Sequence, residues 1–248
     1  GCARRGALES RTVLAVQSTR VVAVESTGEM LLSPVFIFFF LVSGCLAGSK
    51  YEANSYIDSV LRSNLPGQLR SLSLDPAKLP DFELKLKSDL LAGKRTFKAK
   101  FRDGALYGLT NVVRRGDCGP PGWQGPNVTV GCYLALDGLR AHYHVSSRGD
   151  TLSGTKKKYA ADLVVENTNA FIEMTQLKPG RATLKTLSVN TLQFRVTTSR
   201  GLKLNEERTK QFENTLKLTV EKSVLDVLYW RYRSALDHAV SLQALPDV

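Results

Sequence analysis

The chain has 248 residues, of which 43% are hydrophobic, and its formal net charge at pH 7 is +11. This length is enough to bury a core. The length that remains once the export segment described next is removed argues against a second domain. The charge favours anionic partners, although a solvated basic face would only confer solubility.

An apolar run begins at Met30 and closes on Cys-Leu-Ala at residues 45–47. As a helix, residues 31–47 would rise about 25 Å, which is short of the roughly 30 Å hydrocarbon core of a membrane. The small-x-small end is typical of a signal peptide that is cleaved. We therefore expect residues 30–47 to be a signal peptide, residues 48–248 to form a single domain, and the protein to be secreted without a transmembrane anchor.

Residues 1–29 precede this run and show no apolar periodicity. We interpret them as a leader or an artefactual extension that does not fold. The alternative is a cytoplasmic segment whose four arginines hold a signal anchor in place. The short apolar span and its cleavage pattern argue against this alternative.

Export determines which partners the protein can meet. Residues 1–48 hold four Arg and three Glu, so the exported chain keeps 30 basic and 20 acidic residues. Outside cells, a basic protein meets sulfated glycans, anionic lipid headgroups or acidic proteins. Nucleic acid is not expected as a partner, because secretion removes it and the basic clusters lack interleaved aromatic residues.

The first folded element expected is a helix over residues 51–65, where apolar residues recur at helical spacing. Pro66 and Gly67 should end this helix. An extended connector follows over residues 74–81, because each proline excludes the helical region for the residue before it.

Residues 82–198 alternate between apolar and polar with a period of two, which predicts an antiparallel sheet built as a meander. Two hairpins are expected, with turns at Asp103-Gly104 and at Asp137-Gly138. Later strands are expected over residues 159–166, 170–177, 181–189 and 192–198.

Cys118 and Cys132 are the two cysteines of the exported chain, and they flank a segment rich in Gly and Pro. In an exported domain such a pair most simply forms one disulfide. Two cysteines without nearby histidines do not make a zinc site. Asn127 begins an Asn-Val-Thr glycosylation acceptor within the same segment, so we expect it to be glycosylated.

Two Arg-Gly-Asp tripeptides make integrin binding a possible alternative activity; they are Arg115, Gly116 and Asp117, and Arg148, Gly149 and Asp150. The other interpretation is that Gly-Asp pairs simply belong to turns. A basic run follows the second tripeptide, at Lys156, Lys157 and Lys158. This run is either a solvated face or a site for anionic lipids or heparin-like glycans.

Over residues 205–244 the period changes to that of one long amphipathic helix, which would run roughly 55 to 60 Å. The expected fold is therefore α+β: an elongated, curved antiparallel sheet wrapped around a long C-terminal helix, with a short N-terminal helix.

The order of these elements resembles the mite group 7 allergens. The most specific residues are Asp75, Pro76, Lys78, Pro80 and Asp81, followed by the stretch from Gly108 to Asp117. The Cys118–Cys132 loop is not a feature of that group. The resemblance implies a single-barrel relative of the bactericidal/permeability-increasing protein and of juvenile-hormone-binding and takeout carriers. In these proteins an apolar lumen between sheet and helix holds lipids.

By this resemblance we expect the protein to bind a lipid or another hydrophobic small molecule. The candidate lumen residues share the apolar faces of the long helix and the strands; they are Phe212, Leu216, Val220, Val224, Leu228, Phe97, Phe101, Leu134 and Tyr143. The alternative is that these side chains form a solid core. The sequence contains no catalytic, phosphate-binding or dinucleotide-binding motif, so we expect no enzyme, no metal and no cofactor.

Overall fold

Two antiparallel sheets and two helical stretches form the part of the chain that the computed structural model describes. This part comprises residues 49–86, 96–149, 155–200, 202 and 204–248. All of it falls in one compact unit. The predicted leader and signal peptide lie outside the described residues.

The N-terminal helical stretch has three segments: α2 (Lys50–Ser59), the π-helical η1 (Val60–Asn64) and α3 (Leu65–Ser71). It begins with a capping box, in which Ser49 Oγ accepts from Glu52 N–H and Glu52 accepts from Ser49 N–H. The prediction that Pro66 and Gly67 end this helix is wrong. Pro66 lies in the first turn of α3, where the missing N–H costs no hydrogen bond.

Sheet A contains six strands of the described chain: β1 (Ala77–Leu79), β2 (Phe82–Leu86), β3 (Phe97–Tyr107), β7 (Arg140–Arg148), β8 (Lys157–Glu166) and β11 (Gln193–Thr198). Its order is β1-β3-β7-β8-β11, and β2 also pairs with β3. The predicted hairpin at Asp103-Gly104 is wrong, because β3 continues through both residues. The register with β7 shifts there, as at a β-bulge. A Cβ at Gly104 would lie 2.3 Å from the Tyr143 ring, so the glycine allows this close approach.

Sheet B contains five strands of the described chain: β4 (Val113–Arg114), β5 (Gly122–Gln124), β6 (Asn127–Ala135), β9 (Asn169–Leu177) and β10 (Thr183–Val189). Its order is β10-β9-β6-β4, and β5 pairs with β6. The second predicted hairpin is also wrong, because β6 and β7 belong to different sheets. Asp137 and Gly138 instead carry the chain from sheet B to sheet A. The four later strands are confirmed, but they form two sheets rather than one meander.

The residues that carry the family resemblance hold the connector against the end of β3. The Asp75 carboxylate accepts from the N–H of Gly108 at 3.0 Å and from the N–H of Thr110 at 2.8 Å. A short 3₁₀ turn, η2 (Leu109–Asn111), follows Gly108. Farther along the connector, Asp81 accepts from the Asp103 N–H at 2.9 Å.

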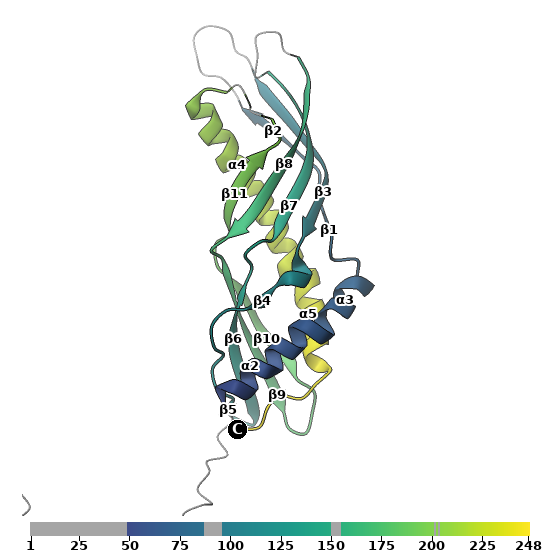
Figure 1. Ribbon diagram of the computed structural model, residues 1–248, viewed down its shortest axis with the longest axis vertical. Coiled ribbons are helices and arrows are strands. Elements are labelled where there is room, and N and C mark those ends of the chain that lie inside the picture. Colours follow the sequence, from purple (N-terminus) through teal and green to yellow (C-terminus); the bar gives the residue numbers. More distant parts are fainter. Residues whose placement is uncertain (1–48, 87–95, 150–154, 201, 203) are drawn as a thin grey trace, which may run out of the picture. The chain divides into compact units, whose positions relative to one another are not determined.

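The C-terminal helical stretch runs without a break through α4 (Glu206–Asp226), the π-helical η3 (Val227–Tyr232) and α5 (Arg233–Ser241). This confirms the long amphipathic helix. In Figure 1 it runs past β11 of sheet A and then past β10 of sheet B; α4 contacts β2 and β11, and α5 contacts β10, η1 and α3. Within the described ranges, no helix combines the length and apolar character that crossing a membrane requires.

Candidate functional site

The apolar interior lies between the C-terminal helical stretch and the inner faces of the two sheets. All nine candidate lumen residues are buried there, each at most 2% exposed. The aromatic members are in contact at sheet A. The centroid of the Phe212 ring lies 5.7 Å from that of Phe97 and 6.3 Å from that of Phe101. The ring centroids of Tyr143 and Phe101 are 5.9 Å apart. Leu134 lies apart from this cluster, on β6 of sheet B.

Three side chains place polar atoms in this interior without a hydrogen-bond partner among the described residues. They are Ser147, through its Oγ; Arg208, through its Nε and Nη2; and Tyr232, through its hydroxyl. An unsatisfied buried donor costs about 1–3 kcal/mol, and more if it is charged. Such atoms are the places in an apolar interior where a ligand's polar group can bind.

Arg208 is not among the site residues predicted from sequence, although the sequence contains a signal for it. Arg208, Phe212, Leu216 and Val220 follow one another at intervals of four residues, which places them on one face of α4. Arg208 therefore begins the apolar stripe. A basic residue at such a position is usually assigned to the solvated face, and the sequence alone does not show that its atoms are buried.

Tyr232 closes the π-helical segment η3, and 1% of it is exposed. Burial raises the pKa of its hydroxyl, so the group stays an uncharged donor at neutral pH and well above it. Tyr56 is also buried, on α2, but its hydroxyl donates to the Val240 carbonyl at 3.1 Å. The contrast shows that the fold can satisfy a buried tyrosine hydroxyl and leaves that of Tyr232 unpaired.

A basic face covers the outer side of sheet A. We define it by six cationic side chains: Lys98, Lys100, Arg102, Arg148, Lys156 and Lys158. They line two hollows of about 500 and 540 Å³, which share Lys100 and Lys158 among their lining residues. Of the predicted basic run, Lys156 and Lys158 are on this face, whereas Lys157 is only half-exposed.

The pairing of strands places like charges on this face opposite each other. Lys98 of β3 lies directly across from Arg148 of β7, and Ser146 separates Lys100 from Lys158. Within the described residues, Lys100 forms an ion pair with Glu83 at 3.8 Å, but Lys98, Arg148 and Lys158 form none. Opposed like charges destabilise a sheet, so the arrangement does not serve the fold.

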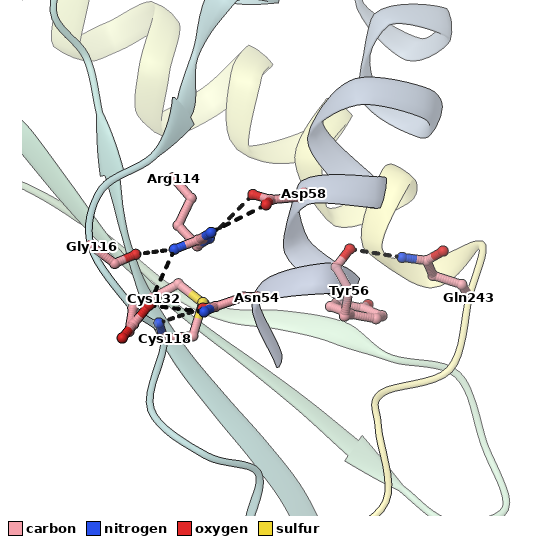
Figure 2. A network of polar contacts seen from close by, with 9 residues as sticks. Asn54, Tyr56, Asp58, Arg114, Gly116, Cys118, Cys132 and Gln243 are labelled. Carbon is pink, nitrogen blue, oxygen red and sulfur yellow. Dashed lines mark hydrogen bonds and ion pairs between the residues drawn. A yellow bond between two sulfur atoms is a disulfide. The ribbon is translucent and has the colours of Figure 1, made fainter. Parts of the chain in front are cut away.

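The first Arg-Gly-Asp tripeptide has hydrogen-bond partners at both charged ends; Figure 2 shows its Gly116 with Asn54 and Arg114 nearby. Asp117 accepts from the Asn54 side chain at 2.9 Å, and Arg114, which pairs with Asp58, donates to the Gly116 carbonyl. Arg115 donates to Asp137 at 3.0 Å and to Asn169 at 2.8 Å. Both charged side chains therefore have partners within the protein, while the Asp117 side chain stays 67% exposed and that of Arg115 44% exposed. Arg148 and Gly149 of the second tripeptide are described, and its Asp150 lies outside the described residues.

The predicted disulfide between Cys118 and Cys132 is confirmed. The segment between them is not a loop throughout, because β5 pairs with the start of β6. Asn127 is half-buried at the first position of β6 and lies opposite Gln124. Its glycosylation stays a prediction. Among the residues placed by the structure, no three His, Cys, Asp or Glu side chains are grouped to hold a metal ion.

No protein-family model matches the chain. Over 200 residues, covering 79% of this chain and 90% of the relative, it is 24% identical to Salivary anticoagulant protein P23 of Ixodes scapularis. The fold is similar to Takeout 1 of Epiphyas postvittana, with a TM-score of 0.37 and 16% identity over 74% of this chain and 90% of that chain. It is also similar to lipopolysaccharide binding protein, with a TM-score of 0.41 and 14% identity over 81% of this chain and 39% of that chain. Takeout carriers are among the groups that the sequence resemblance names.

Proposed function

We propose that the protein is secreted and binds a lipid or another hydrophobic molecule, without catalysis, in the apolar interior between the C-terminal helical stretch and the sheets. The observation that carries the proposal is the set of polar atoms without partners inside this interior. A core built only for stability rarely leaves buried donors unsatisfied, whereas a ligand site holds a few polar groups among apolar side chains.

The relative supports the extracellular part of this proposal, since its printed name places it in saliva. The printed name of that relative describes an anticoagulant and names no enzymatic activity. The predicted signal peptide at residues 30–47 agrees with export.

Uptake of N-phenyl-1-naphthylamine, an uncharged fluorescent probe, tests the proposal when combined with Val224→Trp. Val224 is fully buried on the apolar stripe. The added indole should fill ligand space and abolish probe uptake, while the thermal midpoint stays close to that of the wild type. Leu218→Trp is the matched control, because Leu218 is 68% exposed on the same helix and should leave uptake unchanged.

If these side chains instead form a solid core, two different results are expected. The wild type would not take up the probe, and Val224→Trp would overpack the interior and cost about 1–3 kcal/mol of stability. That pair of results would refute the lipid-binding proposal.

A second candidate function is binding of heparin-like sulfated glycans by the basic face. The observation in its favour is the row of lysines and arginines with like charges opposed, of which several form no ion pair within the described chain. Sulfates spaced along a glycan would neutralise this row.

Heparin-column retention tests this second function with variants of equal charge. Replacing Lys98, Lys100 and Lys158 by Gln should lower the salt concentration that elutes the protein. Replacing the exposed Lys50, Lys210 and Lys222 by Gln removes the same net charge elsewhere and should have a smaller effect. Equal shifts in the two triple variants would show that only net charge matters and would reject a defined site.

A further inference from the structure

We infer that Arg208 binds the carboxylate of a fatty-acid-like ligand at the end of the apolar interior. The inference rests on the proposed function, because it names the headgroup of the ligand proposed there. Two atoms of Arg208, Nε and Nη2, are buried and have no hydrogen-bond partner in the described chain.

These two nitrogens form one edge of the guanidinium group. Their N–H bonds point in the same direction and can donate to the two oxygens of one carboxylate at once. This bidentate pairing is the strongest hydrogen-bonding arrangement open to an arginine side chain. The unpaired part of Arg208 is therefore the part shaped to receive a planar anion.

The position of Arg208 on α4 aligns this edge with the apolar interior. Arg208 lies one helical turn before Phe212 on the same face, about 6 Å along the axis. Phe212 packs against Phe97, the first residue of β3. A headgroup on Arg208 thus lies at the end of sheet A where β3 begins, and the chain of the ligand can continue along the stripe toward Leu216.

Ser147 supplies a second unpartnered donor at the same end of sheet A. It lies opposite Ala99 of β3 and Lys157 of β8 in the strand register, so it belongs to the rows next to Phe97. Its Oγ is buried, as 1% of the residue is exposed, and it has no partner among the described residues. Two of the three side chains with unpartnered polar atoms, Arg208 and Ser147, are therefore at the end where the headgroup would sit.

The charge of Arg208 explains why an anion is preferred over an uncharged polar group. A guanidinium does not lose its proton in proteins, so the buried edge of Arg208 carries positive charge, and among the described residues it has no acceptor. A carboxylate supplies the missing charge and both acceptors. An alcohol supplies one acceptor and no charge.

Displacement of N-phenyl-1-naphthylamine by two ligands with the same chain, oleate and oleyl alcohol, tests the inference. Wild type should bind oleate at least about tenfold more tightly than the alcohol, since hydrogen bonds between charged groups are the stronger class. Arg208→Met should lose this preference and keep its affinity for the alcohol and the probe. Lys210→Met is the control. It removes a positive charge from the same helical turn, but the Lys210 side chain is exposed and paired with Glu206, so this variant should retain the preference for oleate.

The thermal midpoint of the ligand-free protein distinguishes a ligand-binding role of Arg208 from a purely structural one, in which Arg208→Met would lower the midpoint. Arg208→Met should be as stable as the wild type or more stable, because it removes two buried donors that have no partner among the described residues. Oleate should raise the midpoint of the wild type by more than it raises that of Arg208→Met, because the variant keeps only the apolar part of the binding.

The outcomes separate this inference from the proposed function. Equal affinity of the wild type for oleate and the alcohol, or a preference that survives Arg208→Met, would overturn the role of Arg208 while leaving hydrophobic binding in place. Failure of the wild type to bind the probe, the alcohol and oleate would overturn both.

Discussion

At the scale of single residues, three buried tyrosines show how the interior treats polar groups. The Tyr56 hydroxyl donates to the Val240 carbonyl at 3.1 Å, and the Tyr143 hydroxyl reaches the Pro80 carbonyl at 3.4 Å. The Tyr232 hydroxyl has no partner among the described residues. Burial raises the pKa of all three hydroxyls, and the nearby Asp81 adds to the rise at Tyr143.

These raised pKa values predict a loss of stability at high pH. The unfolded chain releases its tyrosine protons near pH 10, whereas the folded protein keeps those of Tyr56, Tyr143 and Tyr232. The stabilising contribution is therefore complete below about pH 10 and declines as the pH rises above it, by up to about 1.4 kcal/mol per pH unit for each tyrosine.

Tyr232→Phe should make this decline in the free energy of unfolding less steep, as measured by urea unfolding between pH 8 and pH 11. At neutral pH the same variant should be as stable as the wild type or more stable, because it removes an unpaired hydroxyl. Tyr51→Phe is the control, since Tyr51 is 79% exposed. An unchanged slope in Tyr232→Phe would show that its hydroxyl is not buried in solution.

At the scale of elements, periodicity was sufficient to place most helices and strands. The predicted strands between residues 159 and 198 correspond to β8, β9, β10 and β11. The helix predicted over residues 205–244 corresponds to the C-terminal helical stretch. Local patterns report which face of an element is apolar. They reported this correctly because each of these elements has one buried and one solvated face.

Turns were where prediction from sequence failed. Asp103-Gly104 and Asp137-Gly138 both have the composition of a hairpin turn, yet the first is a bulge within β3 and the second joins the two sheets. What decides between these outcomes lies far away in sequence: the Tyr143 ring next to Gly104, and the pairing of β6 with β9 rather than β7. Similarly, the burial of the Arg208 edge depends on packing that local sequence does not encode.

The disulfide links elements as well as closing a loop. Cys118 and Cys132 are 14 residues apart, and the Cys118 N–H donates to the Asn54 side chain of α2 at 2.8 Å (Figure 2). Its removal should lower the free energy of unfolding by about 3 kcal/mol, because the unfolded chain gains the entropy of an open loop.

Urea unfolding with and without a reductant measures this effect. The Cys118→Ser/Cys132→Ser variant is the control, because a reductant should not change its midpoint. A wild-type midpoint that is the same in both conditions, with the thiols shown to be reduced, would mean that the bond adds no stability.

At the scale of the whole molecule, the two faces of sheet A have different roles in this account. The inner face holds the aromatic cluster and the proposed ligand, and the outer face carries the basic side chains that line two hollows. The aromatic cluster and the basic side chains lie on opposite faces because neighbouring residues of a strand point to opposite sides of the sheet. Lipid uptake and glycan binding should therefore respond to different substitutions.

Native mass spectrometry of the protein secreted from cells expressing the full chain tests the central claim most directly. Under gentle conditions the account predicts a species heavier than the polypeptide by the mass of a lipid, and release of that lipid on denaturation. The mass of the polypeptide itself should fit a chain that begins near Gly48. A ligand-free mass under every gentle condition, from a protein that also fails to take up N-phenyl-1-naphthylamine, would contradict the account.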